Sequence, residues 1–247
     1  MPAIRIVTLN LWGDREPLLL RLEAAAHALA ALAPDVLFIQ EARVGAALAS
    51  ENTANQLARR LSEVGGEGGR GLGGKYEVVY ACAVSGGPGT WGEGSPAGEE
   101  GLAIVARPPI AETLVTELPD ARPKERRILL SARLADMAVW CHTTHLHWRL
   151  DDGLARERQV AAIDGELRRL QGDWVHILGG DFNASPDTDE IRFLCGRHSL
   201  DGRRTYYQDA FARIHPEKSG WTWARRNPNA SGLAWLEIDR RIDYVFV

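Results

Sequence analysis

Residues 174–186 read WVHILGGDFNASP, and the interpretation of the rest of the chain starts from this stretch. An apolar run of strand length ends in two glycines, then supplies Asp181 and Asn183, and a Ser-Pro turn follows. Because successive residues of an extended strand point to opposite faces, Asp181 and Asn183 should share one side while Phe182 faces the other. The glycines leave room for close approach of another backbone. The stretch predicts a buried strand that ends in a carboxylate and a carboxamide, although an Asx turn capped by Asp181 explains the same residues.

Length and composition favour one large α/β domain over residues 1–247, because 247 residues of which 45% are hydrophobic can bury a full core. The net charge of −4 includes no basic block, so a nucleic-acid partner stays open but is not favoured by the charge. Three isolated cysteines lack metal-type spacing and predict buried thiols in a reducing compartment. No leader and no membrane-spanning segment is evident, so we expect a cytoplasmic protein. Oligomeric state cannot be inferred from the sequence.

The first two predicted strands end in polar residues. Residues 4–11 alternate in hydrophobicity, residues 17–33 have apolar positions at helical spacing, and residues 36–39 form a short continuous apolar run. This strand, helix, strand order places Asn10 and Glu41 at the ends of successive strands. Open α/β sheets collect their ligands at such ends, so we expect the two side chains to face one site.

Hydrophobic periodicity predicts further helices and strands along the rest of the chain. Helices are predicted at 46–63, 151–171 and 187–195, and strands at 76–84, 101–106, 127–134, 137–146 and 241–247. The glycine-rich segment 65–74 is predicted to be a linker, and residues 85–100 a loop that includes Trp91. The chain then divides into two α/β halves, roughly 1–135 and 136–247.

The polar residues at the predicted strand ends share one chemistry: Asn10, Glu41, His145, Asp181, Asn183 and Asp243. Carboxylates and carboxamides without paired cysteines or several histidines favour a hard cation such as Mg²⁺ or Mn²⁺ over zinc. Glu41 suits a metal ligand and Asp181 a general base that holds a water, while Asn10 and Asn183 would orient that water or donate to a phosphate oxygen. No Ser, Cys or Lys stands out as a nucleophile, so direct attack by water is the simplest mechanism.

Each of these residues also has a structural explanation. Glu41 fits a solvated strand end, His145 a core histidine bonded to backbone, and Asn10 a turn residue. Asp243 lies beside Arg240 and Arg241 and fits an ion pair. Only the joint occurrence of the motifs, in order along the chain, favours a functional site.

The motifs, taken in their order along the chain, resemble those of a known protein superfamily. The motifs are Thr8–Trp12, Ile39–Glu41, Glu100–Ile104, Thr144–Leu146 with Arg156 and Gln159, Gly180–Asn183, Asp209–Phe211, Thr222–Trp223 and Arg241–Tyr244. The chain resembles the endonuclease/exonuclease/phosphatase superfamily of DNase I-like, metal-dependent phosphoesterases. The resemblance implies a four-layer α/β sandwich, in which two facing mixed β-sheets are flanked by helices. It implies that Glu41 holds the metal, Asn10 supports metal or phosphate, and Asp181 and Asn183 set the attacking water. It further implies that His145 contacts the phosphate or leaving group and that Asp243 orients a histidine near the C-terminus.

The sequence departs from the pattern of this superfamily at its end. Members continue past the Asp-Tyr strand to a Ser-Asp-His segment, whereas residues 241–247 end the chain within a strand. Either the sequence is truncated, or the protein lacks one strand and that segment, and such a loss costs orders of magnitude in rate. The predicted function is a Mg²⁺-dependent phosphoesterase that hydrolyses a phosphodiester or phosphomonoester by in-line attack of water. The alternative is a catalytically weak module that binds a phosphorylated ligand or a protein.

Overall fold

Two mixed β-sheets form the centre of the protein. The computed structural model describes residues 3–45, 51–67, 75–90, 97–119, 125–170, 172–227 and 238–247. The first sheet has the order β1-β2-β4-β3, made of β1 (Ile6–Asn10), β2 (Val36–Gly45), β3 (Glu77–Gly86) and β4 (Gly98–Ala106). The second sheet has the order β5-β6-β7-β8-β9, made of β5 (Ile110–Leu118), β6 (Arg127–Leu134), β7 (Val139–His145), β8 (Val175–Asp181) and β9 (Asp243–Phe246). The pairs β1–β2 and β7–β8 are parallel, and the other pairs are antiparallel.

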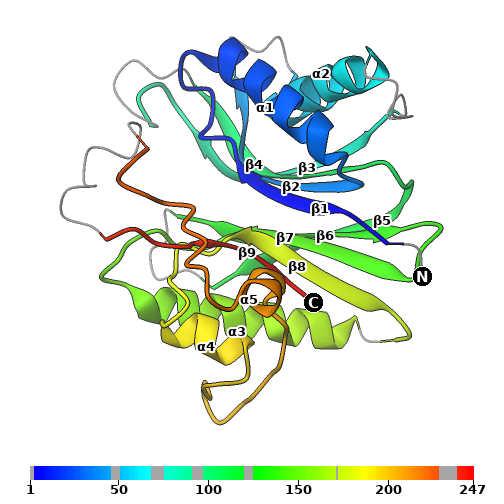
Figure 1. The fold of residues 1–247 in the computed structure, drawn as a ribbon. Helices are drawn as coiled ribbons and strands as arrows, with labels where there is room; N and C mark the ends of the chain where they lie inside the picture. Colours follow the sequence, from blue (N-terminus) through cyan, green and yellow to red (C-terminus); the bar gives the residue numbers. More distant parts are fainter. Residues whose placement is uncertain are drawn as a thin grey trace.

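Helices cover the outer face of each sheet, as Figure 1 shows. The helices α1 (Leu18–Leu32) and α2 (Thr53–Glu67) lie over the first sheet, whereas α3 (Gly153–Arg169) and α4 (Asp189–Leu194) lie over the second. A short helix, α5 (Ala210–Ile214), packs near β9. This arrangement confirms the predicted four-layer α/β sandwich. No helix in the described ranges is both long and apolar enough to cross a membrane.

Strand alternation explains how the layers pack. In β1, Ile6 contacts the core between the sheets, whereas Val7 and Leu9 contact the core beneath α1 and α2. In β4, Leu102 and Ile104 belong to the core between the sheets in the same way. Each strand of the first sheet therefore contributes to two cores, as expected for a sheet covered on both faces.

Several boundaries predicted from the sequence are wrong. The strand β5 was not predicted, and it belongs with β6 to the second sheet, so the halves divide near residue 108 rather than at 135. Residues 65–67 continue α2 instead of opening a linker, while β3 and β4 extend into the predicted loop. Residues 46–50, 68–74 and 91–96, including Trp91, lie outside the described residues. Of the three thiols only that of Cys141 is buried.

Close backbone approach at the end of β8 confirms the reason inferred for its glycines. Gly180 has a φ of +149°, and a Cβ placed there would lie 2.1 Å from the carbonyl oxygen of Thr144 in β7. A Cβ at Gly179 would lie 2.6 Å from the Phe38 ring of the opposite sheet. These contacts bring Asp181 close to β7 and to the first sheet.

One buried polar contact joins the two sheets below the site. Gln40 of β2 donates from Nε2 to Oγ1 of Thr143 in β7 over 3.0 Å, and both residues are fully buried. Thr8 donates to Oε1 of the same glutamine over 3.3 Å. The amide of Gln40 therefore fixes how β1, β2 and β7 meet.

Replacing Thr143 with Val is expected to destabilise the protein by about 1–2 kcal/mol, because it leaves a buried Gln40 N–H without its acceptor at nearly constant volume. Urea unfolding measures this change. The control is Thr113→Val, which removes an exposed hydroxyl from β5. Equal stability of the two variants would show that the contact between the sheets contributes nothing.

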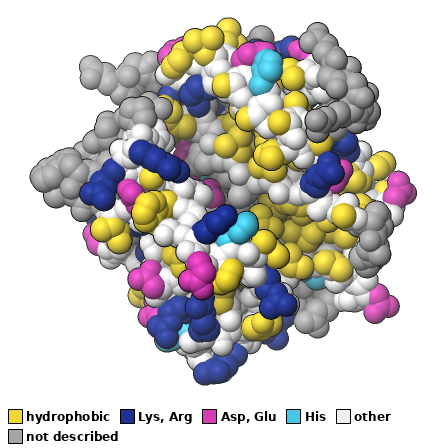
Figure 2. All heavy atoms as spheres, in the orientation of Figure 1, with side chains coloured by type: hydrophobic (Ala, Val, Ile, Leu, Met, Phe, Trp, Pro, Cys, Tyr) yellow, Lys and Arg dark blue, Asp and Glu magenta, His cyan; other side chains and the backbone are white. Residues whose placement is uncertain are grey.

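A cleft opens at one end of the sandwich and continues as a groove between β1 and β9. Figure 2 shows hydrophobic side chains gathered in the hollow between the two sheets. Ile4, Ile6, Val245 and Val247 line this groove, and the polar strand ends line the cleft together with further apolar side chains such as Trp148 and Phe211. Among the described strands, β1 pairs only with β2 and β9 only with β8.

Candidate active site

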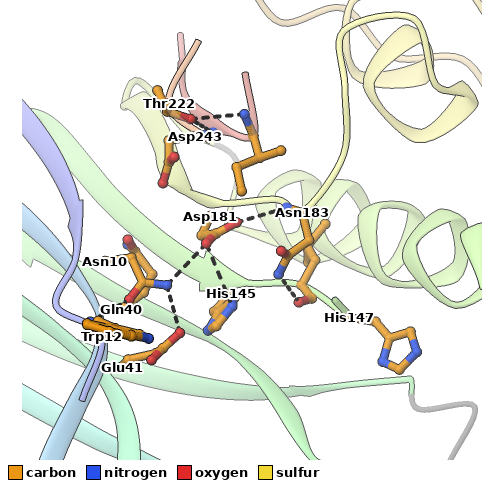
Figure 3. Close-up of polar contacts among 12 residues, drawn as sticks. Asn10, Trp12, Gln40, Glu41, His145, His147, Asp181, Asn183, Thr222 and Asp243 are labelled. Carbon is orange, nitrogen blue, oxygen red and sulfur yellow. Dashed lines mark hydrogen bonds and ion pairs between the residues drawn. The ribbon is translucent and has the colours of Figure 1, made fainter. Parts of the chain in front are cut away.

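Three of the predicted residues meet directly at the end of the sandwich. The Nδ2 of Asn10 in β1 lies 2.9 Å from Oε1 of Glu41 in β2 and 3.1 Å from Oδ2 of Asp181 in β8. The asparagine amide therefore bridges carboxylates that belong to different sheets, as Figure 3 shows. The structure brings together residues 171 positions apart in the sequence, as predicted from their places at strand ends.

A β-bulge points Glu41 toward this site. The pairing of β2 with β4 shifts between Ile39 and Ala42, and Glu41 within the bulge has a φ of +53°. A non-glycine residue in this left-handed region is strained, and such strain often marks a functional position. Trp12 also has a positive φ of +55°, and its N–H donates to Oδ1 of Asn10 over 2.8 Å. The backbone on both sides of the site is therefore shaped around Asn10 and Glu41.

Asp181 and Asp243 form a pair of facing carboxyl groups. They are directly opposite in the antiparallel ladder of β8 and β9. Burial, and then the neighbouring Asp243, raise the pKa of Asp181 to about 8, although hydrogen bonds from Asn10 and Asn183 oppose this shift. Burial also raises the pKa of Asp243, against a hydrogen bond with Thr222. Two buried carboxylates this close repel each other, so without a cation the pair retains a proton near neutral pH.

His145 lies at the end of β7 beside Asp181, and its Nε2 is 3.8 Å from Oδ2 of that residue. Burial, and then the nearby Arg127, hold the pKa of His145 well below its usual value. The imidazole is therefore neutral at pH 7, and it can donate one hydrogen bond or act as a neutral ligand. Arg127 donates from Nη1 to the backbone oxygen of His145 over 3.4 Å, and sequence reasoning did not identify this arginine.

Asn183 lies next to Asp181, as predicted, but a turn rather than the predicted alternation along a strand places it there. The strand ends at Asp181, and Asn183 has a φ of +51°. Its N–H donates to Oδ1 of Asp181 over 2.9 Å, which is the Asx turn considered as the alternative. Its Nδ2 donates to the backbone oxygen of Leu146 over 3.0 Å, so one N–H of this amide already has an acceptor. The turn holds the Asp181 carboxylate in a fixed orientation.

Asp243 does not form the alternative ion pair with Arg241. Arg241 donates to both carboxylate oxygens of Asp209, at 3.1 and 2.6 Å, and this pair is buried. Asp243 instead faces Asp181, and its backbone N–H donates to Oγ1 of Thr222 over 3.3 Å. Thr222 belongs to one of the motifs on which the family resemblance rests. Its contact with β9 depends on tertiary packing, so the sequence did not predict it.

The donors at the site fit a hard cation. Glu41, Asp181 and Asp243 supply carboxylate oxygens, whereas Asn10 directs its NH₂ group toward Glu41 and Asp181 and its Oδ1 toward the N–H of Trp12. Within the described ranges, no three His, Cys, Asp or Glu side chains already converge as a metal cluster. Burial first, and then the neighbouring Asp243, raise the pKa of Asp181, so the ionised forms of these two carboxyl groups are disfavoured in this site. A divalent cation would compensate their charge.

The fold and the site define a class of proteins: two-sheet α/β sandwiches with an acidic centre where strands of both sheets end. The sequence matches the profile of the Endonuclease/Exonuclease/phosphatase family over residues 7–247, and the chain belongs to this family. No curated protein sequence matches the chain.

Solved structures share the fold at low identity. An endonuclease/exonuclease/phosphatase family protein from Leptotrichia buccalis is 19% identical with a TM-score of 0.69, covering 99% of this chain and 87% of that one. The human Nocturnin catalytic domain with bound sulfate anion is 15% identical with a TM-score of 0.67, covering 98% and 80%. D. rerio TDP2 complexed with single strand DNA product is 17% identical with a TM-score of 0.66, covering 98% and 82%. At these identities the likeness shows a common fold.

Proposed function

We propose that this protein is a divalent-metal-dependent phosphoesterase that hydrolyses a phosphodiester or phosphomonoester by in-line attack of water. The observation that carries the proposal is the bridge from Asn10 to Glu41 and Asp181, which joins oxygen donors of both sheets. Family membership supports it, as does the bound sulfate of the Nocturnin structure, because sulfate resembles phosphate. Cytoplasmic localisation and a single-domain organisation stay predictions.

The residues would divide the chemistry among them. Glu41, with Asn10 beside it, would hold Mg²⁺ or Mn²⁺. When bound, the metal would offset the negative charge that develops on the phosphoryl oxygens. Asp181, oriented by the N–H groups of Asn183 and Asn10, would be ionised when a metal compensates its charge, and its carboxylate would then accept a proton from the attacking water. The neutral His145 would donate a hydrogen bond to a phosphoryl or leaving-group oxygen. Asp243, directly opposite Asp181, would add a second negative charge beside it and so influence when Asp181 is ionised.

Removing the divalent metal tests the metal dependence. Excess EDTA is expected to reduce hydrolysis of bis(4-nitrophenyl) phosphate to background, and Mg²⁺ or Mn²⁺ in excess of the chelator to restore it, because Glu41 and Asp181 alone offer no positive charge to the phosphoryl group. Calcium-loaded EDTA in the presence of Mg²⁺ is the control for the chelator itself. Turnover that persists in excess EDTA would contradict the proposal. Absence of turnover under every condition, with a phosphorylated ligand still raising the melting temperature, would favour the binding module.

A further inference from the structure

The amide of Asn10 can adopt two orientations that differ by a half-turn of the NH₂ and oxygen positions. Its Nδ2 lies between Glu41 and Asp181 (Figure 3), whereas its Oδ1 accepts the backbone N–H of Trp12 over 2.8 Å. After a half-turn, Oδ1 would face the carboxyl oxygens and the NH₂ group would face the Trp12 N–H, so these hydrogen bonds would be lost. The N–H of Trp12 therefore holds the amide in the orientation that joins the two sheets.

The Trp12 N–H points at Asn10 because the chain bends sharply after β1, in residues 11–15 (turn 11–15). Trp12 has a φ of +55°, a left-handed conformation that a bulky residue adopts only where its surroundings enforce it. The backbone N–H of Leu11 donates to the oxygen of Gln40 over 2.9 Å, which fixes the start of the turn on β2. The strained residue that follows needs a further support.

Arg21, in the first turn of α1, supports this turn through its backbone oxygens. Its Nη1 donates to the oxygen of Leu11 over 2.5 Å, and its Nη2 donates to that of Gly13 over 3.4 Å. Its Nε and Nη2 also donate to the oxygen of Arg15, at 3.1 and 2.5 Å. One planar guanidinium thus bonds to the carbonyls on both sides of Trp12, which fixes the strained residue between them.

The Trp12 ring makes a second contact with the same guanidinium. The Cζ of Arg21 lies 5.6 Å from the ring centroid, and that of Arg15 lies 5.1 Å from it. Elsewhere in turn 11–15, Asp14 pairs with Arg43 of β2 at 3.3 Å, and the Arg43 side chain is buried. The Asp14 pair attaches the turn to the sheet, whereas Arg21 contacts both the backbone and the ring of the strained residue.

The charge of Arg21 offers a different explanation for its place. Burial lowers the pKa of Arg21, whereas the nearby carboxylates of Glu16, Glu41 and Asp14 oppose that shift. A positive charge there would favour the ionised form of Glu41 without fixing any orientation. The two explanations predict different results for Arg21→Lys, because lysine keeps the charge but offers a single nitrogen in place of the planar fork.

We infer, on the basis of the proposed function, that Arg21 is a positioning residue, which fixes turn 11–15 and thereby the orientation of the Asn10 amide. Trp12 and Asn10 line the cleft, whereas Arg21 is not among the described residues that do so. Arg21 therefore acts from behind the site, through the Trp12 N–H, rather than on the substrate. The fixed amide keeps its hydrogen bond to Asp181, which orients the carboxylate that would receive the proton of the attacking water.

Nuclear magnetic resonance of the Asn10 side chain tests this geometry without any turnover. In protein that contains ¹⁵N-labelled asparagine, the Nδ2 signals of Asn10 are those missing from Asn10→Ser. In the wild type we expect both Nδ2 protons to exchange with water at least about tenfold more slowly than those of a solvated amide, because carboxyl oxygens accept them. Arg21→Lys should remove this protection, because one nitrogen cannot hold the carbonyls on both sides of Trp12.

Kinetics with Mg²⁺ and bis(4-nitrophenyl) phosphate test whether this orientation serves the reaction. Arg21→Lys is expected to lower kcat about tenfold with little change in KM, because it misorients Asp181 without touching the substrate. The same substitution in an Asn10→Ser background should cost nothing further, since its effect passes through Asn10. The matched control is Arg60→Lys, which changes a partly buried arginine of α2 that donates to the backbone oxygen of Gln56. It should keep the wild-type kcat and the protection of the amide.

Retained protection of the Asn10 amide in Arg21→Lys would overturn the inference and leave charge as the role of Arg21. Equal losses of kcat from Arg21→Lys in the wild-type and Asn10→Ser backgrounds would overturn it as well. If circular dichroism shows that Arg21→Lys does not fold, Arg21→Gln takes its place in both measurements, because its amide also bonds fewer carbonyls. If the wild type hydrolyses no phosphodiester, the proposed function fails, and the exchange measurement alone decides the role of Arg21.

Discussion

Replacing Asp181 with Asn is expected to reduce kcat/KM for phosphoester hydrolysis by about 10³-fold. The carboxylate is the group that would accept the proton of the attacking water, and Asn has nearly the same shape but no basicity. The turn that orients it should persist, because an Asn oxygen can still accept the N–H of Asn183. Steady-state kinetics with a chromogenic phosphodiester, together with circular dichroism to confirm folding, measure the effect.

The matched control for this substitution is Asp136→Asn, which changes an exposed residue between β6 and β7 in the same chemical way. This variant should keep the wild-type rate. If Asp181→Asn retained more than about a tenth of the wild-type kcat/KM, the assignment of Asp181 as general base would be wrong. Another group would then have to receive the proton.

Hydrophobic periodicity was enough to predict most of the fold. The alternation of β1, the helical spacing of α1 and the apolar run of β2 all appear in the structure near their predicted places. It failed for β5, an edge strand, because most of residues 110–118 are exposed and their apolar side chains are interrupted by Glu and Thr. Missing that strand also displaced the predicted boundary between the halves. An exposed edge strand leaves too weak a pattern for local reasoning to detect.

The candidate site was predictable where it depends on strand ends. Asn10 ends β1 and Asp181 ends β8, as predicted, although these strands belong to different sheets. Glu41 was predicted at a strand end, but β2 continues to Gly45 and Glu41 lies at a bulge within it. The left-handed backbone of Glu41 and Asn183 was not predictable, because a bulge and a turn depend on the pairing partner. The contacts of Thr222 and Thr143 join segments far apart in the sequence. Local hydrophobic patterns therefore cannot predict them.

The facing carboxyl groups also predict how stability depends on pH and on metal. In the unfolded chain Asp181 ionises near pH 4, whereas burial and Asp243 raise its pKa to about 8 in the folded protein. Between these values the folded state binds more protons, so the free energy of unfolding falls as pH rises. His142 and His145 act in the opposite direction, since burial lowers their pKa values, but only below about pH 6.5. Between pH 6.5 and 8 the histidines therefore contribute little, and the pH dependence of stability reports mainly on the carboxyl groups.

In the metal-free protein we expect the free energy of unfolding to fall by about 2 kcal/mol between pH 6.5 and 8. Asp181→Asn should remove most of this slope and leave a smaller one below pH 7 from Glu100, whereas Asp136→Asn should keep it. Saturating Mg²⁺ should restore the stability of the wild type at pH 8, because a cation that binds only the folded state replaces the proton between the carboxylates. Urea unfolding at each pH measures these values. A wild-type profile as flat as that of Asp181→Asn would show that Asp181 and Asp243 carry no shared proton, and the electrostatic case for a cation at this site would then be lost.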